Sequence, residues 1–497
     1  MKIRLRYIFI LLSSVMFLYL FSIYHRAPHV DDAWIGEQVY WLNEDGFVKN
    51  VLMTNIDNNE DGLLVYHKAF VNSGLVMVKL FGFDLSVLKS VSLLSMLLFL
   101  IIFYFYIGDI RRLLSAKHYF MVVGLLMVNP LVFEYSFVFR PEIMLMTIGF
   151  LSFIFLEQSL RYPNKKYIFV FISSVLSALC LLVHLNGLIF VLAGAVVLLY
   201  RKEFKLFLMF SLITIIGLYV YFLHISSFEE FIIWYKTISG FETGKAITSY
   251  NLVFIWKMIL NFLDEQRRYL HSPKEVVISL LVLTSVITGF RAIKKRTPLV
   301  MPYLLLLMIS LAIIAPNKTT KYLLLLLPYF SMIILVAIKF HFKIRLPKRQ
   351  IVFHHRNSYY LFVALIIYFS FSFSYDIFIS IEKHKTLTFS NITKEFVKDD
   401  VKNTIVLAPM TFIFDEIGKY KKIRGLMSYK ERLKTMPQLT GDKFFKLADE
   451  ENIDYIILND YYLNLFDLND IKEEDKSIDY KFMGEKEKHY IFRRRDL

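Results

Sequence analysis

Cysteine is almost absent from this 497-residue chain, since Cys180 is the only one. A single thiol forms neither a disulfide framework nor a Cys-x-x-Cys motif, so cysteine usage gives no sign of redox chemistry. The chain also lacks internal repeats and low-complexity tracts. Charged residues are sparse, at 20%, whereas 56% of the residues are hydrophobic and the mean hydropathy is +0.49. This composition is more apolar than that of an ordinary soluble domain.

Long uncharged apolar runs occupy about half of the first 376 residues. A helix needs about 20 residues to cross the hydrocarbon core, because every backbone polar group must be bonded within the segment. Eleven runs reach or approach that length: 7–24, 90–108, 119–133, 143–156, 167–183, 185–200, 206–223, 276–290, 297–317, 322–338 and 357–375. The sequence therefore predicts a mainly α, polytopic membrane protein with about eleven transmembrane helices.

The first of these runs has some features of a signal peptide. Lys2, Arg4 and Arg6 precede it, as in a basic n-region. However, the run is 18 residues long and no small-x-small cleavage site follows it. We therefore expect a helix that is retained in the membrane.

The net charge of +15 arises in the membrane-spanning part of the chain. Residues 1–376 hold 36 Lys and Arg against 21 Asp and Glu, whereas the remaining tail holds 22 of each. If the first helix leaves the cytoplasm, the cytoplasmic segments hold 22 Lys and Arg in 55 residues, and the opposite loops hold 14 in about 134. This asymmetry follows the positive-inside rule and predicts a cytoplasmic N-terminus. The basic charge therefore reflects topology, and we expect no nucleic-acid partner.

The long loop that follows the first helix carries helical patterning without a spanning stretch. Ile35 and Val39 fall on one face of a helix, and Glu37 falls on the other. Such a pattern is typical of an amphipathic helix that lies in the membrane interface. A second amphipathic segment covers about 70–81.

The last part of the chain has the pattern of a small soluble α/β domain. Its predicted elements are two short buried strands at 404–408 and 455–458, helices at 412–420 and 444–451, and an edge strand at 490–494. We therefore expect a membrane domain over 1–376 and a soluble, non-cytoplasmic domain over 377–497.

Ionisable residues collect at the predicted non-cytoplasmic face. Because such residues are costly near a membrane, they suggest a functional site. They are Asp31, Asp32, His67, Lys68, Glu134, Arg140, Glu142, His184, Lys318 and Lys321. A carboxylate pair can act as a general base and orient an acceptor, while Arg, Lys and Tyr can hold a phosphate ester. Together they suit displacement of a lipid phosphate from a sugar, through an oxocarbenium-like transition state and with inversion at the anomeric carbon.

Four sequence motifs carry a resemblance to a known family. They are 29–46 (HVDDAWIGEQVYWLNEDG), Asn129-Pro130 followed by Arg140-Pro141-Glu142, His184-Leu185-Asn186-Gly187, and Lys321-Tyr322 followed by five leucines and Pro328. These motifs resemble the first-loop acidic motif, the Pro…Arg-x-acid segment, a polar residue before a glycine, and the basic-Tyr-leucine-rich-Pro signature of GT-C glycosyltransferases. The type that they resemble is the protein O-mannosyltransferase and aminoarabinose transferase type. The resemblance covers about residues 1–340 and implies a GT-C-like helical bundle.

The resemblance also implies roles for the residues that it matches. Asp31 matches the catalytic acid, and Asp32 stands where the family usually has Glu. Arg140, Lys321 and Tyr322 match residues that hold the phosphate of a polyprenyl donor. The full set of candidate substrate-binding residues is Arg140, Glu142, His184, Lys321, Tyr322, His67 and Lys68. The family often has His-Pro where this chain has His67-Lys68.

The acidic pair has structural alternatives. Asp31 or Asp32 could cap the amphipathic helix at Ala33. Alternatively, the two carboxylates and His67 could bind a divalent cation, as in some GT-C members. No spacing in the sequence is specific for a metal, so we expect none.

The basic candidates have structural alternatives as well. Arg140 and Glu142 could form an ion pair that only stabilises the fold. His184 could hydrogen-bond between helices, and Lys318 and Lys321 could be interfacial anchors.

Three functional hypotheses follow. The first is a membrane glycosyltransferase that uses a polyprenyl-phosphate hexose or pentose and a lipid, glycan or protein acceptor, with the α/β tail binding the acceptor or covering the site. The second is a transporter or flippase of lipid-linked sugars, which usually places charges near the midplane and contains repeats. The third is a non-catalytic membrane scaffold. The charges at one face favour the enzyme, and the lack of disulfides favours a bacterial inner membrane.

Overall fold

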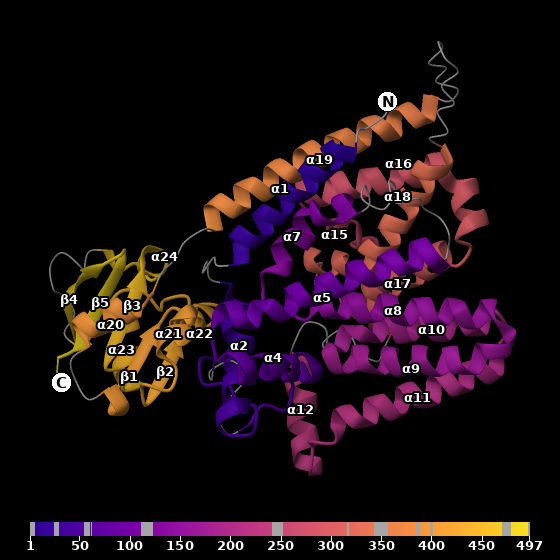
Figure 1. Ribbon diagram of the computed structural model, residues 1–497. Coiled ribbons are helices and arrows are strands. Elements are labelled where there is room, and N and C mark those ends of the chain that lie inside the picture. The colour runs from indigo at the N-terminus through magenta and orange to yellow at the C-terminus, as the bar shows by residue number, and fades with distance from the viewer. Residues whose placement is uncertain are drawn as a thin grey trace. The chain divides into compact units, whose positions relative to one another are not determined.

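The computed structural model describes residues 5–23, 29–53, 60, 62–110, 123–240, 252–315, 318–341, 356–383, 388–397, 401–469 and 479–495. The chain forms two compact units, each built from separated segments (Figure 1). The helical unit comprises Met1–Tyr24, Leu64–Phe70 and Lys89–Lys383. The sheet unit comprises His25–Leu63, Val71–Leu88 and His384–Leu497.

Apolar helices make up most of the helical unit, which confirms the predicted fold class. Seven helices are long and apolar enough to cross a membrane: Leu85–Gly108, Glu142–Arg161, Pro163–Val183, Phe204–Phe222, Pro273–Arg296, Thr320–Lys339 and Tyr360–Glu382. Three shorter apolar helices cover Leu12–Ser22, Leu185–Tyr200 and Val300–Ile314. The predicted span at 119–133 begins outside the described residues. The chain is therefore an integral membrane protein.

Helices make up most of the described part of the helical unit. The α-helices that lie wholly or partly in the helical unit are α1 (Leu5–Ile23), α4 (Lys68–Phe81), α5 (Leu85–Phe105), α7 (Pro130–Ser136), α8 (Glu142–Arg161), α9 (Lys166–Val183), α10 (Leu188–Tyr200), α11 (Phe204–Phe222), α12 (Phe228–Gly240), α14 (Leu252–Leu263), α15 (Gln266–Leu270), α16 (Pro273–Arg296), α17 (Val300–Ile314), α18 (Leu327–His341) and α19 (Arg356–Lys383). The described part of the unit also contains a π-helical turn, η1 (Tyr106–Ile110), and three 3-10 helices, η2 (Pro163–Lys165), η3 (Leu185–Gly187) and η4 (Thr320–Leu326). The second predicted amphipathic segment is confirmed by α4.

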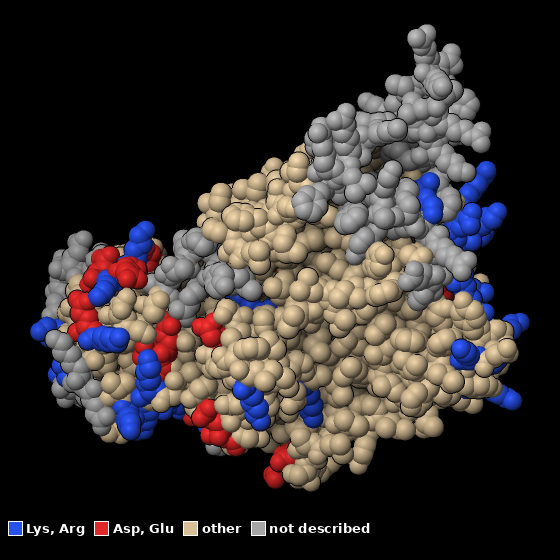
Figure 2. All heavy atoms as spheres, viewed as in Figure 1, with Lys and Arg blue, Asp and Glu red and all other residues tan. Residues whose placement is uncertain are grey.

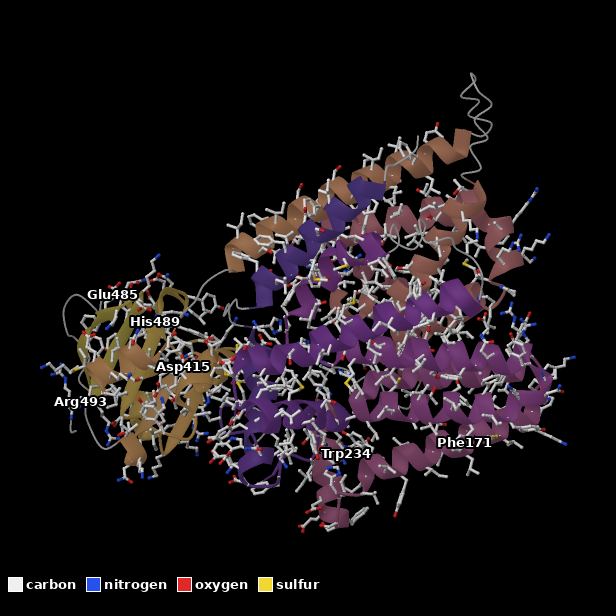
Figure 3. All side chains as sticks on the ribbon, viewed as in Figure 1. Phe171, Trp234, Asp415, Glu485, His489 and Arg493 are labelled. Atoms are coloured by element: carbon white, nitrogen blue, oxygen red, sulfur yellow. The ribbon has the colours of Figure 1, made fainter. Side chains whose placement is uncertain are left out.

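Small and hydroxylated residues join neighbouring helices of this unit. The Ser152 hydroxyl on α8 lies 2.8 Å from the Ser177 hydroxyl on α9. A Cβ atom on Gly217 of α11 would lie only 2.3 Å from the Cβ atom of Ala178, so glycine is required for that close approach. Such contacts replace the hydrophobic driving force that helices lack in lipid. Outward-facing Phe171 on α9 is half exposed, as expected of a lipid-facing side chain (Figure 3).

Exposed charges on the helical unit gather where helices join. Figure 2 shows a mostly uncharged face, with basic side chains at the end where α8 joins α9 and α10 joins α11. The exposed residues there are Arg161, Lys165, Arg201 and Lys202. This distribution agrees with the short basic loops of the sequence, whereas the orientation across the membrane stays a prediction.

The C-terminal part of the sheet unit is a five-stranded sheet with helices. Its strands are β1 (Ile405–Ala408), β2 (Lys422–Gly425), β3 (Tyr455–Asn459), β4 (Tyr480–Lys486) and β5 (His489–Arg494), in the order β2-β1-β3-β5-β4. Strands β2, β1 and β3 are parallel, and β5 is antiparallel to both β3 and β4. Its helical elements are α20 (Ser390–Phe396), η5 (Val401–Asn403), η6 (Met410–Phe412), α21 (Ile413–Glu416), α22 (Leu426–Arg432), α23 (Asp442–Glu450) and α24 (Asp460–Leu465).

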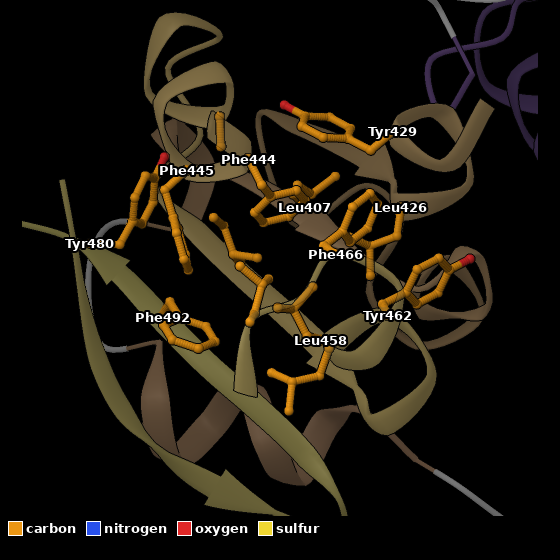
Figure 4. Close-up of a cluster of buried hydrophobic side chains, with 14 of the residues drawn as sticks. Leu407, Leu426, Tyr429, Phe444, Phe445, Leu458, Tyr462, Phe466, Tyr480 and Phe492 are labelled. Carbon is orange, nitrogen blue, oxygen red and sulfur yellow. The ribbon is translucent and has the colours of Figure 1, made fainter. Parts of the chain in front are cut away.

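The core of this sheet is made of aromatic and aliphatic side chains. Phe444 and Phe445 on α23 pack with Leu407, Leu458 and Phe492 from three strands (Figure 4). Strands β1 and β3 were predicted correctly from short apolar runs, because the side chains of these runs are buried in this core. The predicted C-terminal strand is present as β5, but the prediction that it lies at an edge of the sheet is wrong. It lies between β3 and β4, because the hairpin with β4 shields its second edge.

The predicted helix at 412–420 ends earlier, at Glu416 of α21. Gly418 has a φ of +80°, which ends the helical path, and a Cβ atom there would lie 2.2 Å from the Tyr40 hydroxyl. The chain then enters β2, which the sequence analysis did not predict.

The predicted first-loop helix is present as α2 (Val30–Glu44), and it packs within the sheet unit against η6 and α21. The polar face that was expected to carry Glu37 is buried, since this side chain is only 1% exposed. Its Oε1 atom accepts hydrogen bonds from Trp41 Nε1 (3.0 Å) and from the backbone N–H groups of Val51 (2.7 Å) and Leu52 (3.2 Å). Glu37 therefore joins α2 to the loop that follows it.

Replacing Glu37 by glutamine is expected to stabilise the protein at pH 8. Burial raises the pKa of Glu37 from its ordinary 4.5 to about 7. Between these values the folded chain keeps a proton that the unfolded chain has released, so stability falls as pH rises, by about 3 kcal/mol in all. Glutamine retains the Oε1 acceptor and removes this loss. The tryptophan fluorescence of the protein, to which Trp41 contributes, is followed during thermal unfolding from pH 4.5 to 8. It gives the dependence of stability on pH. Glu44 is exposed on the same helix, so Glu44→Gln should lose stability with rising pH as the wild type does. If Glu37→Gln showed the same loss, the pH dependence could not be assigned to Glu37.

Candidate functional site

The predicted Arg140–Glu142 segment forms a buried ion pair in the helical unit. Pro141 is the N-cap of α8, and Glu142 is its first residue. Arg140 donates from Nε (3.1 Å) and Nη2 (2.8 Å) to the two carboxylate oxygens of Glu142. The arginine side chain is 10% exposed and the glutamate is fully buried. This two-pronged geometry fixes the plane of the guanidinium group.

Lys321 joins this pair from another part of the chain. It lies on η4, and its Nζ atom is 4.0 Å from Glu142 Oε1. The same ammonium group lies 5.5 Å from the centre of the Tyr322 ring. With two cations and one carboxylate, the cluster has a surplus positive charge. It is therefore suited to an anionic ligand.

His184 stands at the junction of α9 and η3, where it caps both elements. Its Nδ1 atom accepts a hydrogen bond from the Asn186 backbone N–H (2.9 Å), so in the neutral ring the proton is on Nε2. Gly187 is required here, since a Cβ atom would lie 2.4 Å from the carbonyl group of Cys180. The predicted His-Leu-Asn-Gly motif thus makes a tight turn that presents the imidazole ring.

His67 stacks on His184, with the ring centres 4.6 Å apart and the planes at 18°. Tyr322 also lies near His184, with the two ring centres 6.1 Å apart and the planes at 74°. Burial lowers the pKa of His67 to about 4, and burial together with His67 holds the pKa of His184 well below its ordinary value. Both imidazoles are therefore neutral at pH 7 and can donate or accept hydrogen bonds without adding charge.

Lys68 does not join this cluster, although the sequence analysis grouped it with His67. Its Nζ atom donates to the Tyr221 backbone oxygen and to His224 Nδ1, and it lies 4.8 Å from the Tyr221 ring centre. The His224 Nε2 atom lies 2.8 Å from the Leu64 carbonyl oxygen. Burial lowers the pKa of Lys68 to about 8. The reason for the separation is that successive residues at the start of α4 point in different directions.

The acidic pair Asp31 and Asp32 lies in the sheet unit, in the first turn of α2. The helix begins at Val30, and its N-cap is His29, whose Nδ1 atom accepts from the Asp31 backbone N–H (3.2 Å). The alternative that either aspartate caps a helix at Ala33 is therefore wrong. The Asp31 side chain is 19% exposed, whereas Asp32 is fully buried. Asp31 is thus the more accessible member of the pair.

The described residues contain no group of three or more His, Cys, Asp or Glu side chains placed to hold a metal ion.

Comparisons with known proteins show similarity at the level of the fold. No family profile and no curated protein sequence matches the chain. ArnT from Cupriavidus metallidurans, in a crystal structure with bound undecaprenyl phosphate, is similar with a TM-score of 0.59 and 10% identity over 98% of this chain and 97% of that chain. The Archaeoglobus fulgidus oligosaccharyltransferase AglB, in complex with an inhibitory peptide and a dolichol-phosphate, has a TM-score of 0.51 and 9% identity over 90% and 69% of the two chains. The chain has the fold of GT-C membrane glycosyltransferases.

Within this GT-C fold, the sequence analysis missed a fully buried arginine beside Tyr322. Arg268 on α15 donates to Glu265 Oε1 (2.7 Å), to the Thr319 carbonyl (2.6 Å) and to the Ala315 carbonyl (2.9 Å). Its guanidinium carbon lies 5.6 Å from the Tyr322 ring centre. Lys318, which was a candidate, also binds Glu265 (2.9 Å). Arg268 therefore holds the backbone at Ala315 and at Thr319, two residues before Lys321.

A sequence signal for Arg268 existed in the run Asp264-Glu265-Gln266-Arg267-Arg268. Charged residues of both signs, placed just before a membrane helix, are compatible with local ion pairs. Only one of the two arginines is buried, however. Arg268 is buried with Glu265, whereas Arg267 pairs with Asp264 and is largely exposed. Which arginine faces inward depends on the rotation of the short helix α15, and this is decided by packing.

Proposed function

We propose that the chain is an inverting glycosyltransferase that moves a sugar from a polyprenyl-phosphate donor to an acceptor on the non-cytoplasmic side of the membrane. The observation that carries the proposal is the positively charged Arg140–Glu142–Lys321 cluster, set beside neutral His184 and Tyr322 in a chain with a GT-C fold. ArnT with the same fold has been crystallised with undecaprenyl phosphate. A lipid-linked sugar phosphate is the anion that such a cluster would meet in a membrane.

Each group of residues has a role in this proposal. Lys321 and Arg140 hold the donor phosphate, with Glu142 fixing the guanidinium plane. Tyr322 and His184 donate neutral hydrogen bonds to the same phosphate or to the sugar. His67 supports the His184 ring by stacking, and Lys68 binds substrate only if its own pairing with His224 is exchanged.

The proposed reaction is a single displacement. Asp31 accepts the proton of the acceptor hydroxyl or amine, with Asp32 beside it in the same helical turn. The acceptor oxygen or nitrogen forms a bond to the anomeric carbon, and the bond from that carbon to the phosphate oxygen breaks. Polyprenyl phosphate leaves as an anion beside Lys321 and Arg140, whose charges stabilise it. Attack from the face opposite the phosphate inverts the anomeric centre.

Mass spectrometry of reaction products tests the proposal. Purified protein in nanodiscs is incubated with a mixed pool of polyprenyl-phosphate sugars and a membrane extract as the acceptor source. We expect release of free polyprenyl phosphate and a matching sugar mass added to an acceptor. If the donor instead stays intact and moves between the leaflets of sealed proteoliposomes, the flippase hypothesis replaces the glycosyltransferase hypothesis. If neither change occurs, the proposal fails.

A further inference from the structure

The sheet unit contains a pocket that has no place in the proposed transfer reaction. Its volume is about 300 Å³, and it is lined by α2, by the loop that follows α2, and by the segment from α21 to β2. All three segments belong to the sheet unit, so the pocket is complete within it. The volume lies at the lower end of the range of small-molecule sites, about 300–1,000 Å³. A ligand of roughly one sugar ring with a substituent would fill it.

Cations dominate the polar lining of this pocket. Lys49, Lys421 and Lys422 line it, together with the carboxylates of Glu37 and Glu60. The carboxylates are largely occupied: Glu37 accepts the hydrogen bonds that join α2 to its loop, and Glu60 is bound by Lys422 and by Arg424 (2.8 Å). A surplus of positive charge is therefore presented to a ligand.

The three lysines differ in how far they are engaged. Lys49 binds Asp45 (2.6 Å) and lies 4.0 Å from the centre of the Trp41 ring. Lys422 binds Glu60. Lys421 is exposed, and no ion pair to it is formed by the described part of the chain. Its ammonium group can reach a ligand anion without breaking an existing pair.

The remaining lining offers apolar and aromatic contacts. Trp41 is held in one orientation by its hydrogen bond to Glu37. Tyr420, Ile413 and Ile417 also line the pocket. Sugar rings combine C–H faces, which pack on such side chains, with hydroxyl groups, which donate to carboxylate oxygens. Inorganic phosphate alone would leave the apolar wall unused. A neutral sugar would leave the lysines without a partner.

We propose that this pocket binds an anionic sugar, with a phosphate or carboxylate group directed to Lys421 and Lys422 and the ring packed against Trp41 and Tyr420. A hexose phosphate and a uronic acid share this chemistry. Binding is measured without any transfer reaction, so the result does not depend on the proposed function.

Isothermal titration of the full-length protein in nanodiscs tests the site, with glucose 6-phosphate, glucuronic acid, glucose and inorganic phosphate as probes. We expect glucose 6-phosphate or glucuronic acid to bind more tightly than glucose or phosphate. Lys421→Gln should weaken that binding about five-fold, the upper range for one exposed charge pair, and Lys421→Glu should weaken it further. Lys446→Gln on α23, an exposed lysine away from the pocket lining, should leave it unchanged.

Several outcomes would overturn the inference. If phosphate bound as tightly as glucose 6-phosphate, the pocket would be a simple anion site that does not recognise the sugar ring. If glucose bound as tightly as the anionic sugars, the lysine charges would have no role in binding. Absence of binding by both anionic sugars, or equal losses in Lys421→Gln and Lys446→Gln, would refute it. Whichever of the two anionic sugars binds more tightly identifies a phosphate or a carboxylate as the preferred anion.

Discussion

Replacing Asp31 by asparagine is expected to lower the kcat/KM of sugar transfer about 10²–10⁴-fold, the usual contribution of a general base. Asparagine has nearly the same shape but cannot accept the acceptor proton. The Asp31 side chain is 19% exposed at the first turn of α2, so the change leaves no large cavity. The contact of Asp31 with His29 (3.4 Å) is at the surface and contributes little to stability. Transfer from a polyprenyl-phosphate sugar in nanodiscs measures the effect.

A matched control separates chemistry from local structure in this experiment. Asp45→Asn makes the same chemical change at the other end of α2, where Asp45 is exposed and its carboxylate forms an ion pair with Lys49 (2.6 Å). We expect near wild-type transfer and unchanged thermal unfolding for it. Unchanged transfer by Asp31→Asn would exclude Asp31 as the base. Asp32→Asn is less informative, because Asp32 is fully buried and its replacement changes folding as well.

Replacing Arg140 by glutamine is expected to destabilise the helical unit by about 3–5 kcal/mol and to abolish donor binding. The change leaves the Glu142 carboxylate buried without its two-pronged partner. Removing one member of a buried ion pair has this cost, because the remaining charge is no longer compensated. Unfolding of the purified protein in a graded detergent mixture gives the loss of stability. Binding of a polyprenyl-phosphate sugar is measured on the fraction that stays folded.

The double variant Arg140→Gln/Glu142→Gln distinguishes a phosphate-binding role from a purely structural ion pair. With both charges gone, most of the stability should return, since no buried charge is left alone. Donor binding should stay lost if Arg140 contacts the phosphate. Recovery of both properties would assign the pair to folding alone. For comparison, Lys166→Gln breaks a more exposed pair with Glu203 (3.1 Å) in the same unit and should cost less than about 1 kcal/mol.

Several features of the candidate site could be predicted from local sequence. Arg140-Pro141-Glu142 places both charges at the start of one helix, and the structure joins them directly. The sequence analysis identified the His184 motif together with its glycine, and the small size of Gly187 is needed beside Cys180. Such features depend on residues that are close in the chain. Their geometry is therefore largely set by backbone conformation.

Other features depend on residues far apart in the chain and could not be predicted. Lys68 follows His67 directly, yet it binds His224, more than 150 positions away, instead of the cluster. Glu37 has the spacing of a solvent-facing residue on an amphipathic helix, but packing within the sheet unit buries it. Strand β5 was expected at an edge and lies inside the sheet. In each case the partner is supplied by another segment, and periodicity contains no information about that segment.

The amino-acid sequence by itself determined that this protein spans a membrane, that its basic charge is confined to the helical part, and that a small α/β domain follows. The physical reason is that long apolar runs leave a chain no stable state in water, and that helix and strand periods are local properties. Only the tertiary structure decided which distant charges meet: Lys321 with Glu142, and Lys422 and Arg424 of β2 with Glu60 in the loop after α2. Bringing together segments that are hundreds of residues apart requires the whole packed fold, because each ion pair depends on the burial and orientation of both partners.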